Sequence, residues 1–147
     1  MGLLKLPLSD TMTPAIFAKR ILNRIPRYIA LPERDWPAWA DLPSPAMDDE
    51  QVLGIYQNQE KSVAGGLVIT SERLYLRNGD SWACSSYKDM VDVECFEPGL
   101  EKSENDSIIV TLRDHSKLVV PVRGRDGRFA DVFEFCRFLM RVSTHSR

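Results

Sequence analysis

Hydrophobic positions recur at helical spacing in two stretches, one near each end of the sequence. In the first, a Thr-Pro pair at positions 13 and 14 is typical of a helix start, because threonine supplies a capping oxygen and proline fits the first helical position. Phe17, Ile21 and Ile25 then fall on one face, and Pro26 ends the run. The pattern predicts an amphipathic helix that packs its apolar face on the domain.

The second helical stretch, Phe129 to Val142, is far more apolar. One face is formed by Phe129, Val132, Phe133, Cys136, Leu139 and Met140. Three more apolar residues widen that face: Phe135, Phe138 and Val142. A helix with so wide an apolar face must be buried over most of its circumference. We expect it to close the open end of a curved sheet.

Between these helices the apolar and polar residues alternate, which predicts about seven short strands. The expected strands are Gln51–Tyr56, Leu67–Thr70, Leu74–Arg77, Trp82–Ser86, Val91–Phe96, Ile108–Leu112 and Leu118–Val122. The pair Asn78-Gly79 predicts a tight hairpin, because both residue types accept a positive φ. Nearly all the connections are short, so the strands are expected to be antiparallel.

The stretch before the strands has a different composition, with many prolines and the indoles of Trp36 and Trp39. Proline excludes a helix or a central strand here. We expect an extended segment with one or both indoles inserted into the domain surface; the alternative is a proline-rich docking peptide. The chain is therefore divided into an N-terminal helix and Pro/Trp-rich extension, residues 1–49, and a domain over residues 50–147.

Seven antiparallel strands, grouped as four and three and followed by one helix, resemble a pleckstrin-homology-like domain of the bacterial or GRAM type. The resembling segments are 52–58, 66–76 and 87–93, with Val-Ile-Thr-x-x-Arg-Leu-Tyr at 68–75 the most family-like. The resemblance covers residues 50–142. It implies a mainly β fold, a seven-stranded antiparallel barrel capped by the C-terminal helix. It also implies a binding scaffold for phosphoinositides, peptides or folded partners, not an enzyme.

Composition narrows the class of protein. The chain has 147 residues, of which 44% are hydrophobic and 27% charged, enough for one domain with a sizeable core. Its net charge of −2 argues against nucleic acid as a partner. We find no apolar run long enough for a membrane span and no secretory signal pattern. The three cysteines are odd in number and widely spaced, so we expect reduced thiols and a cytoplasmic protein.

Acidic residues gather between positions 89 and 106. They are Asp89, Asp92, Glu94, Glu97, Glu101, Glu104 and Asp106. Such a run is commonly a solvated face. The functional interpretation is a negative surface that docks a basic partner protein and steers its approach. In its most specific form, the hypothesis is a bacterial immunity-type inhibitor that blocks a toxin through these acids together with Trp36 and Trp39.

Basic residues offer a rival hypothesis. Lys19, Arg20, Arg24 and Arg27 mark the polar side of the first helix, which could serve a membrane-proximal, lipid-binding adaptor. A second candidate anion or lipid site precedes the last helix and consists of Arg123, Arg125 and Arg128. The 58–63 loop holds a single lysine, whereas an inositide headgroup needs several converging cations.

Catalytic chemistry has little support in the sequence. The two histidines, His115 and His145, fall in a predicted turn and in the C-terminal tail, and neither has metal-ligand spacing. Cys136 is expected in the core, and Cys84 and Cys95 on strands with their thiols facing inward. We therefore expect no catalytic residues, no metal and no cofactor. The oligomeric state is left open by the sequence.

Overall fold

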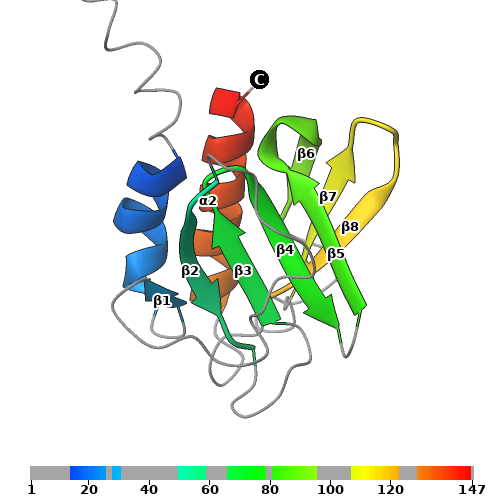
Figure 1. The fold of residues 1–147 in the computed structure, drawn as a ribbon. Helices are drawn as coiled ribbons and strands as arrows, with labels where there is room; N and C mark the ends of the chain where they lie inside the picture. Colours follow the sequence, from blue (N-terminus) through cyan, green and yellow to red (C-terminus); the bar gives the residue numbers. More distant parts are fainter. Residues whose placement is uncertain are drawn as a thin grey trace, which may run out of the picture.

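The computed structural model describes residues 14–25, 28–30, 50–58, 66–78, 81–95, 107–122 and 129–146. Within these ranges the fold is mainly β, with two antiparallel sheets and helices packed against one side of the larger sheet (Figure 1). The first sheet has five strands: β1 (Tyr28–Ala30), β2 (Val52–Tyr56), β3 (Gly66–Thr70), β4 (Arg73–Asn78) and β5 (Ser81–Ser86). The second has three: β6 (Met90–Glu94), β7 (Ser107–Leu112) and β8 (Lys117–Pro121).

The mainly β fold and the C-terminal helix are confirmed, but a seven-stranded closed barrel is wrong. The sheets are separate, with strand orders β1-β2-β3-β4-β5 and β6-β7-β8. The additional strand, β1, comes from the residues before position 50 and pairs with β2 through Tyr28↔Tyr56 and Ala30↔Gly54. After β5, the 3-10 turn η4 (Tyr87–Asp89) leads the chain into the second sheet. Consequently β5 and β6, although consecutive, do not pair.

The expected hairpin between β4 and β5 is present with a shifted turn. Asn78 pairs with Ser81, so the two connecting residues are 79 and 80 rather than the predicted Asn78-Gly79 pair. Residues 79 and 80 lie outside the described ranges. The alternation of strand residues correctly located both strands, whereas the turn signal was read one residue early.

The core lies between the inner face of the large sheet and α2 (Phe129–Ser146). Leu67 and Leu74 of the sheet and Phe138 of the helix are fully buried. The ring of Tyr56 meets Phe135 edge-on at 5.7 Å between centroids. The Tyr56 hydroxyl also donates a hydrogen bond of 2.8 Å to buried Asp131 in the first turn of α2. Apolar packing and one polar contact therefore fix the helix on the sheet.

The apolar face of α2 is narrower than the sequence predicted. Phe133 and Met140 are each 43% exposed, so placing them on the buried face was wrong. The remaining described apolar positions are buried: Val132, Phe135, Cys136, Phe138, Leu139 and Val142. A helix that contacts a sheet on one side can keep part of the apolar surface on its other side exposed.

The N-terminal helical segment packs into the same core, as expected for its apolar face. Residues 14–21 are helical and continue into the 3-10 turn η2 (Leu22–Arg24). Ala18, Ile21, Leu22 and Ile25 are buried in one cluster with the residues of both sheets and α2. The ring of Phe17 lies 5.3 Å from that of His145 near the end of α2. The segment is therefore an integral layer of this fold.

Candidate functional site

A groove opens at the corner where the two sheets separate. It has a volume of about 1110 Å³. We call it the corner groove, and the residues that line it are Glu72, Arg73, Cys84, Ser85, Ser86, Lys88, Asp89, Leu112, Arg113 and Asp114. These residues come from the β3–β4 turn, the end of β5, η4 and the β7–β8 turn. The groove was not foreseen from the sequence, because it results from the sheets failing to close.

Tyr87 holds in place the turn η4, which supplies Lys88 and Asp89 to the corner groove. Its hydroxyl lies 2.8 Å from the carbonyl oxygen of Thr70 and 2.9 Å from that of Arg73, both of which can accept its hydrogen. Its ring is fully buried and meets Phe138 edge-on at 6.0 Å. Burial raises the pKa of the Tyr87 hydroxyl well above its usual value, so the group stays protonated as a donor. Turn η4 is thereby fixed to the β3–β4 turn.

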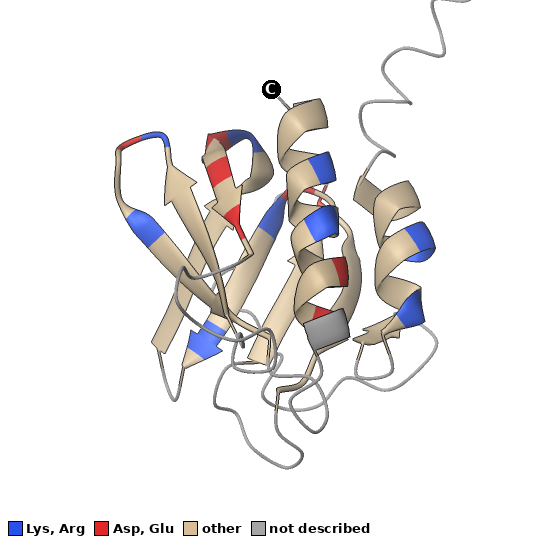
Figure 2. Cartoon of the chain, turned by 180° about the vertical axis from the view of Figure 1, so that it is seen from behind, with Lys and Arg blue, Asp and Glu red and all other residues tan. Residues whose placement is uncertain are grey.

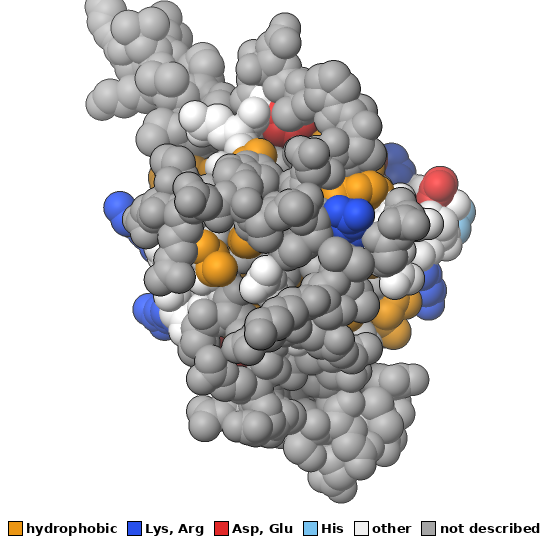
Figure 3. All heavy atoms as spheres, turned by 60° about the horizontal axis from the view of Figure 1, so that its bottom comes forward, with side chains coloured by type: hydrophobic (Ala, Val, Ile, Leu, Met, Phe, Trp, Pro, Cys, Tyr) orange, Lys and Arg blue, Asp and Glu red, His pale blue; other side chains and the backbone are white. Residues whose placement is uncertain are grey.

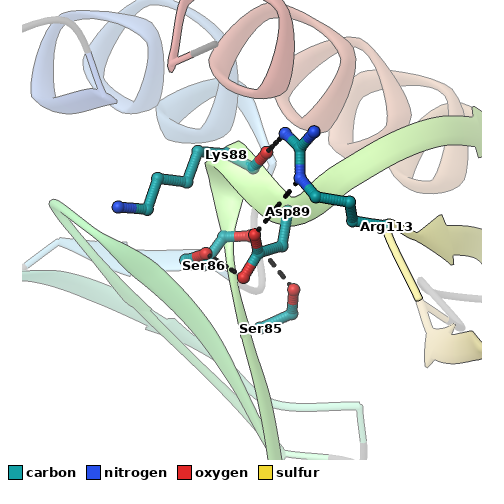
Figure 4. Close-up of polar contacts among 5 residues, drawn as sticks. All are labelled: Ser85, Ser86, Lys88, Asp89 and Arg113. Carbon is teal, nitrogen blue, oxygen red and sulfur yellow. Dashed lines mark hydrogen bonds and ion pairs between the residues drawn. The ribbon is translucent and has the colours of Figure 1, made fainter.

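Asp89 and Arg113 join the two sheets across the groove (Figure 4). Asp89 accepts a hydrogen bond of 2.9 Å from Ser86 Oγ, and its other oxygen lies 3.7 Å from Arg113 Nε. Arg113 Nη2 donates to the Lys88 carbonyl oxygen at 2.8 Å. The Lys88 side chain extends away from this group in Figure 4. Both members of the ion pair are more than half exposed, so the pair contributes about 1 kcal/mol at most.

The β7–β8 turn that forms the far wall is shaped by its own side chains. Asp114 accepts hydrogen bonds from the Ser116 backbone N–H at 3.0 Å and from the Ser116 hydroxyl at 2.5 Å. These bonds lower the pKa of the Asp114 carboxyl. His115 has a φ of 73°, which confirms the predicted tight turn. Asp114 therefore has a local structural role in shaping its own turn.

The three cysteines lie in two different environments, one exposed and two buried. Cys84 is exposed and lines the corner groove, so its predicted inward orientation was wrong. Its partner across the strand pair, Tyr75, is buried in a second apolar cluster with Ile55 and Val68, whereas Cys84 is exposed on β5, the last strand of the sheet. Cys95 and Cys136 are buried, as expected, and burial together with a hydrogen bond to Cys95 raises the pKa of the Cys136 thiol. Among the described residues no group of three metal-ligating side chains is found.

The acidic surface is only partly within the described ranges. Asp92 and Glu94 are exposed on β6, and Asp89 is exposed just before it. From behind, the acidic bands on β6 are visible beside the turn that precedes it (Figure 2). The other predicted docking residues lie outside the described residues: Trp36, Trp39, Glu97, Glu101, Glu104 and Asp106.

The basic residues predicted to bind an anion or a lipid also lie only partly within the described ranges. Lys19, Arg20 and Arg24 are exposed on the outer side of the N-terminal helical segment (Figure 2), whereas Arg27, Arg123, Arg125 and Arg128 lie outside the described residues. On the face seen in Figure 3, the described Lys and Arg side chains in view form separate small groups rather than one patch. The described part of the chain contains no helix with the length and apolarity to cross a membrane.

Sequence reasoning also missed a buried carboxylate, Glu50, at the start of the domain. Thr70 Oγ1 donates a hydrogen bond to it, and Tyr75 Oη lies 3.5 Å from both of its oxygens. Burial and the neighbouring Glu50 carboxylate raise the pKa of the Tyr75 hydroxyl. Little in the sequence indicates that Glu50 is buried, because it ends an acidic run, Asp48-Asp49-Glu50, of a kind that is typical of solvent-exposed chain. The group ties residue 50 to β3 and β4.

Comparison of the chain with protein-family models, with curated proteins and with solved structures found no match.

Proposed function

We propose that this chain is a non-catalytic protein-interaction module of pleckstrin-homology-like type that binds a basic partner protein. Its most specific form is an immunity-type inhibitor that blocks a toxin. The observation that carries the proposal is the exposed pair Asp92 and Glu94 on β6. Among the described residues no hydrogen bond or ion pair occupies either carboxylate. A rigid strand therefore presents two charges that are available to a partner.

Further acidic residues stand close to this pair in the sequence. Asp89 precedes β6, and four further acids follow it within residues 96–106. A surface with one sign of charge accelerates encounter with an oppositely charged partner and makes binding sensitive to salt.

The test uses a partner captured from the source cells with the full chain as bait. The double variant Asp92→Lys/Glu94→Lys should weaken binding to that partner by about tenfold or more and reduce the salt dependence of Kd. The matched control is Glu72→Lys, an exposed acid on the β3–β4 turn. Unchanged affinity and salt dependence in the double variant would reject the acidic surface as the docking site.

The alternative function is a membrane-proximal adaptor, supported by exposed Lys19, Arg20 and Arg24. The buried apolar face of the same helix counts against it, because that face cannot enter a lipid interface while it is packed in the core. Only the charges would then contribute, at about 1 kcal/mol each near an anionic surface. Co-sedimentation with phosphatidylserine-containing vesicles that is lost in Lys19→Glu/Arg20→Glu/Arg24→Glu would favour this alternative.

A further inference from the structure

The outer edge of β5 differs from the other sheet edges. Four strands end the two sheets: β1, β5, β6 and β8. Within the described ranges, no strand pairs with the outer edge of β5. Proteins commonly protect such edges with charges, prolines or short strands, because an unpaired edge is a template for another strand.

Three of the four edges carry such protection. Strand β1 has only three residues, β6 carries Asp92 and Glu94, and β8 carries Lys117 and Pro121. In contrast, β5 has six residues, Ser-Trp-Ala-Cys-Ser-Ser, with neither charge nor proline. Its Ser81, Ala83 and Cys84 are exposed. The longest edge strand is therefore the one without protection.

The chemistry of β5 suits pairing with an identical strand. When a strand pairs with its own copy about a two-fold axis, every charge near the centre meets a like charge, which is destabilising. A neutral strand avoids this repulsion, and the small side chains of serine, alanine and cysteine permit close approach of a second backbone. A different partner protein would impose no such requirement for neutrality. The absence of charge thus favours a second copy of this chain.

The surroundings of β5 are compatible with that partner. The corner groove beside it provides open space of about 1110 Å³. Its walls carry three acidic and three basic side chains: Glu72, Asp89, Asp114, Arg73, Lys88 and Arg113. A second copy would therefore meet a wall with no net charge.

We propose that β5 pairs antiparallel with β5 of a second copy, joining two five-stranded sheets about a two-fold axis. The pairing forms an interface between copies and is independent of the partner bound at the acidic surface. Because residues on one face of the sheet must meet residues on the same face, Cys84 lies opposite its own counterpart, Trp82 or Ser86 of the second copy. In each of these registers the two Cys84 thiols are close neighbours across the interface.

The test measures the mass of the full, reduced chain by light scattering over a range of concentrations. The wild-type chain should reach twice the single-chain mass. Ala83→Lys should weaken the dimer by about tenfold or more, because like charges then face each other at its centre. Cys84→Lys repeats the test at a second exposed position in case the first variant does not fold. Val119→Lys, on protected β8, is the matched control and should dimerise as the wild type does.

A short bis-maleimide cross-linker then tests whether the two Cys84 thiols are close together. It should link two wild-type chains through Cys84, since Cys95 and Cys136 are buried, and Cys84→Ser should abolish the product. Three results would overturn the proposal: a single-chain mass at every concentration, a dimer that persists in folded β5 lysine variants, or a dimer in which Cys84 does not cross-link.

Discussion

Gly54 shows how a single residue sets the junction between β1 and β2. A Cβ atom added at this position would lie 2.2 Å from Tyr28 Oη and 2.3 Å from Tyr28 Cζ. These distances are far shorter than any real contact, so the ring of Tyr28 occupies the space that a larger residue would need. Because Tyr28 is itself buried, the ring has little room to move.

Gly54→Ala is therefore expected to lower the free energy of unfolding by about 1–3 kcal/mol. Urea denaturation of the wild type, Gly54→Ala, Tyr28→Ala and the double variant measures the effect. In the Tyr28→Ala background the glycine substitution should cost much less, because the obstructing ring is gone. Equal costs in both backgrounds would contradict a direct clash.

Tyr87 makes stability depend on alkaline pH. Its pKa is raised by burial, whereas the unfolded side chain titrates near its ordinary value of about 10. Below that pH both states hold the proton. Above it the unfolded chain releases the proton while the folded chain retains it, so the free energy of unfolding falls as pH rises.

The expected decline attributable to Tyr87 approaches about 1.4 kcal/mol per pH unit above pH 10. Urea unfolding at pH 7 and at several alkaline values should show a shallower decline in Tyr87→Phe than in the wild type. That variant should also be about 1 kcal/mol less stable at pH 7, through loss of the hydrogen bond to Thr70 or Arg73. Parallel alkaline slopes would show that Tyr87 does not carry this dependence.

For single residues, the sequence predicted most of the side chains that are buried in the helix α2, but it did not predict which face of a strand a side chain occupies. The apolar periodicity correctly marked Cys136 as a core residue. It could not orient Cys84, because β5 has small residues on both faces and its alternation gives no inward side. The strand register places Cys84 on the same face as Tyr75, and its exposure follows from the position of β5 at the end of the sheet, which no local pattern specifies.

At the scale of elements, α2 combines a buried and an exposed aromatic residue within one helix. Phe138 is fully buried and contacts both Tyr87 and Phe135 edge-on, at 6.0 Å between centroids in each case. Phe133 is 43% exposed. The same substitution at these two positions therefore separates core packing from helix propensity.

Phe138→Ala is expected to destabilise the protein by about 3–5 kcal/mol, because it removes buried surface and leaves a cavity. Phe133→Ala should change stability by about 1 kcal/mol or less. Thermal or urea unfolding of both variants gives the comparison. Similar losses at the two positions would mean that the solvent-facing side of α2 is also packed against something.

Long, strongly periodic elements were predicted well, and short ones were missed. Both helical runs and the main strands follow their hydrophobic patterns. Strand β1 was not expected, since Tyr28–Ala30 is only three residues long and stands between a proline and a proline-rich stretch. Its existence depends on pairing with β2, which supplies hydrogen bonds that its own sequence does not suggest.

For the whole molecule, the two sheets, the N-terminal helical segment and α2 enclose the main core, and a second, smaller cluster of Ile55, Val68 and Tyr75 is buried in the large sheet. Ile21, Leu22, Ile25 and Tyr28 are buried in the same cluster as residues of α2 and both sheets. The local sequence pattern does not determine whether the sheets close into a barrel, because closure depends on whether β5 and β6 pair. Since they do not pair, the corner groove opens between the sheets.

Deletion of residues 1–30 should therefore prevent stable folding instead of releasing an intact domain. Each lost large apolar side chain contributes about 1.5–3 kcal/mol through burial, and the total stability of a domain is only about 5–15 kcal/mol. Circular dichroism and limited proteolysis of the truncated chain measure the outcome. A folded, protease-resistant remainder would contradict this expectation and would leave the basic helix available for another role.

The position of α2 in the chain order also has a consequence for synthesis. Its residues follow every strand, yet they cover the apolar faces of both sheets. While the chain emerges from the ribosome, those faces have no cover until the α2 residues have been translated. The nascent strands therefore expose hydrophobic surface until α2 is made. We expect molecular chaperones to bind them during that interval.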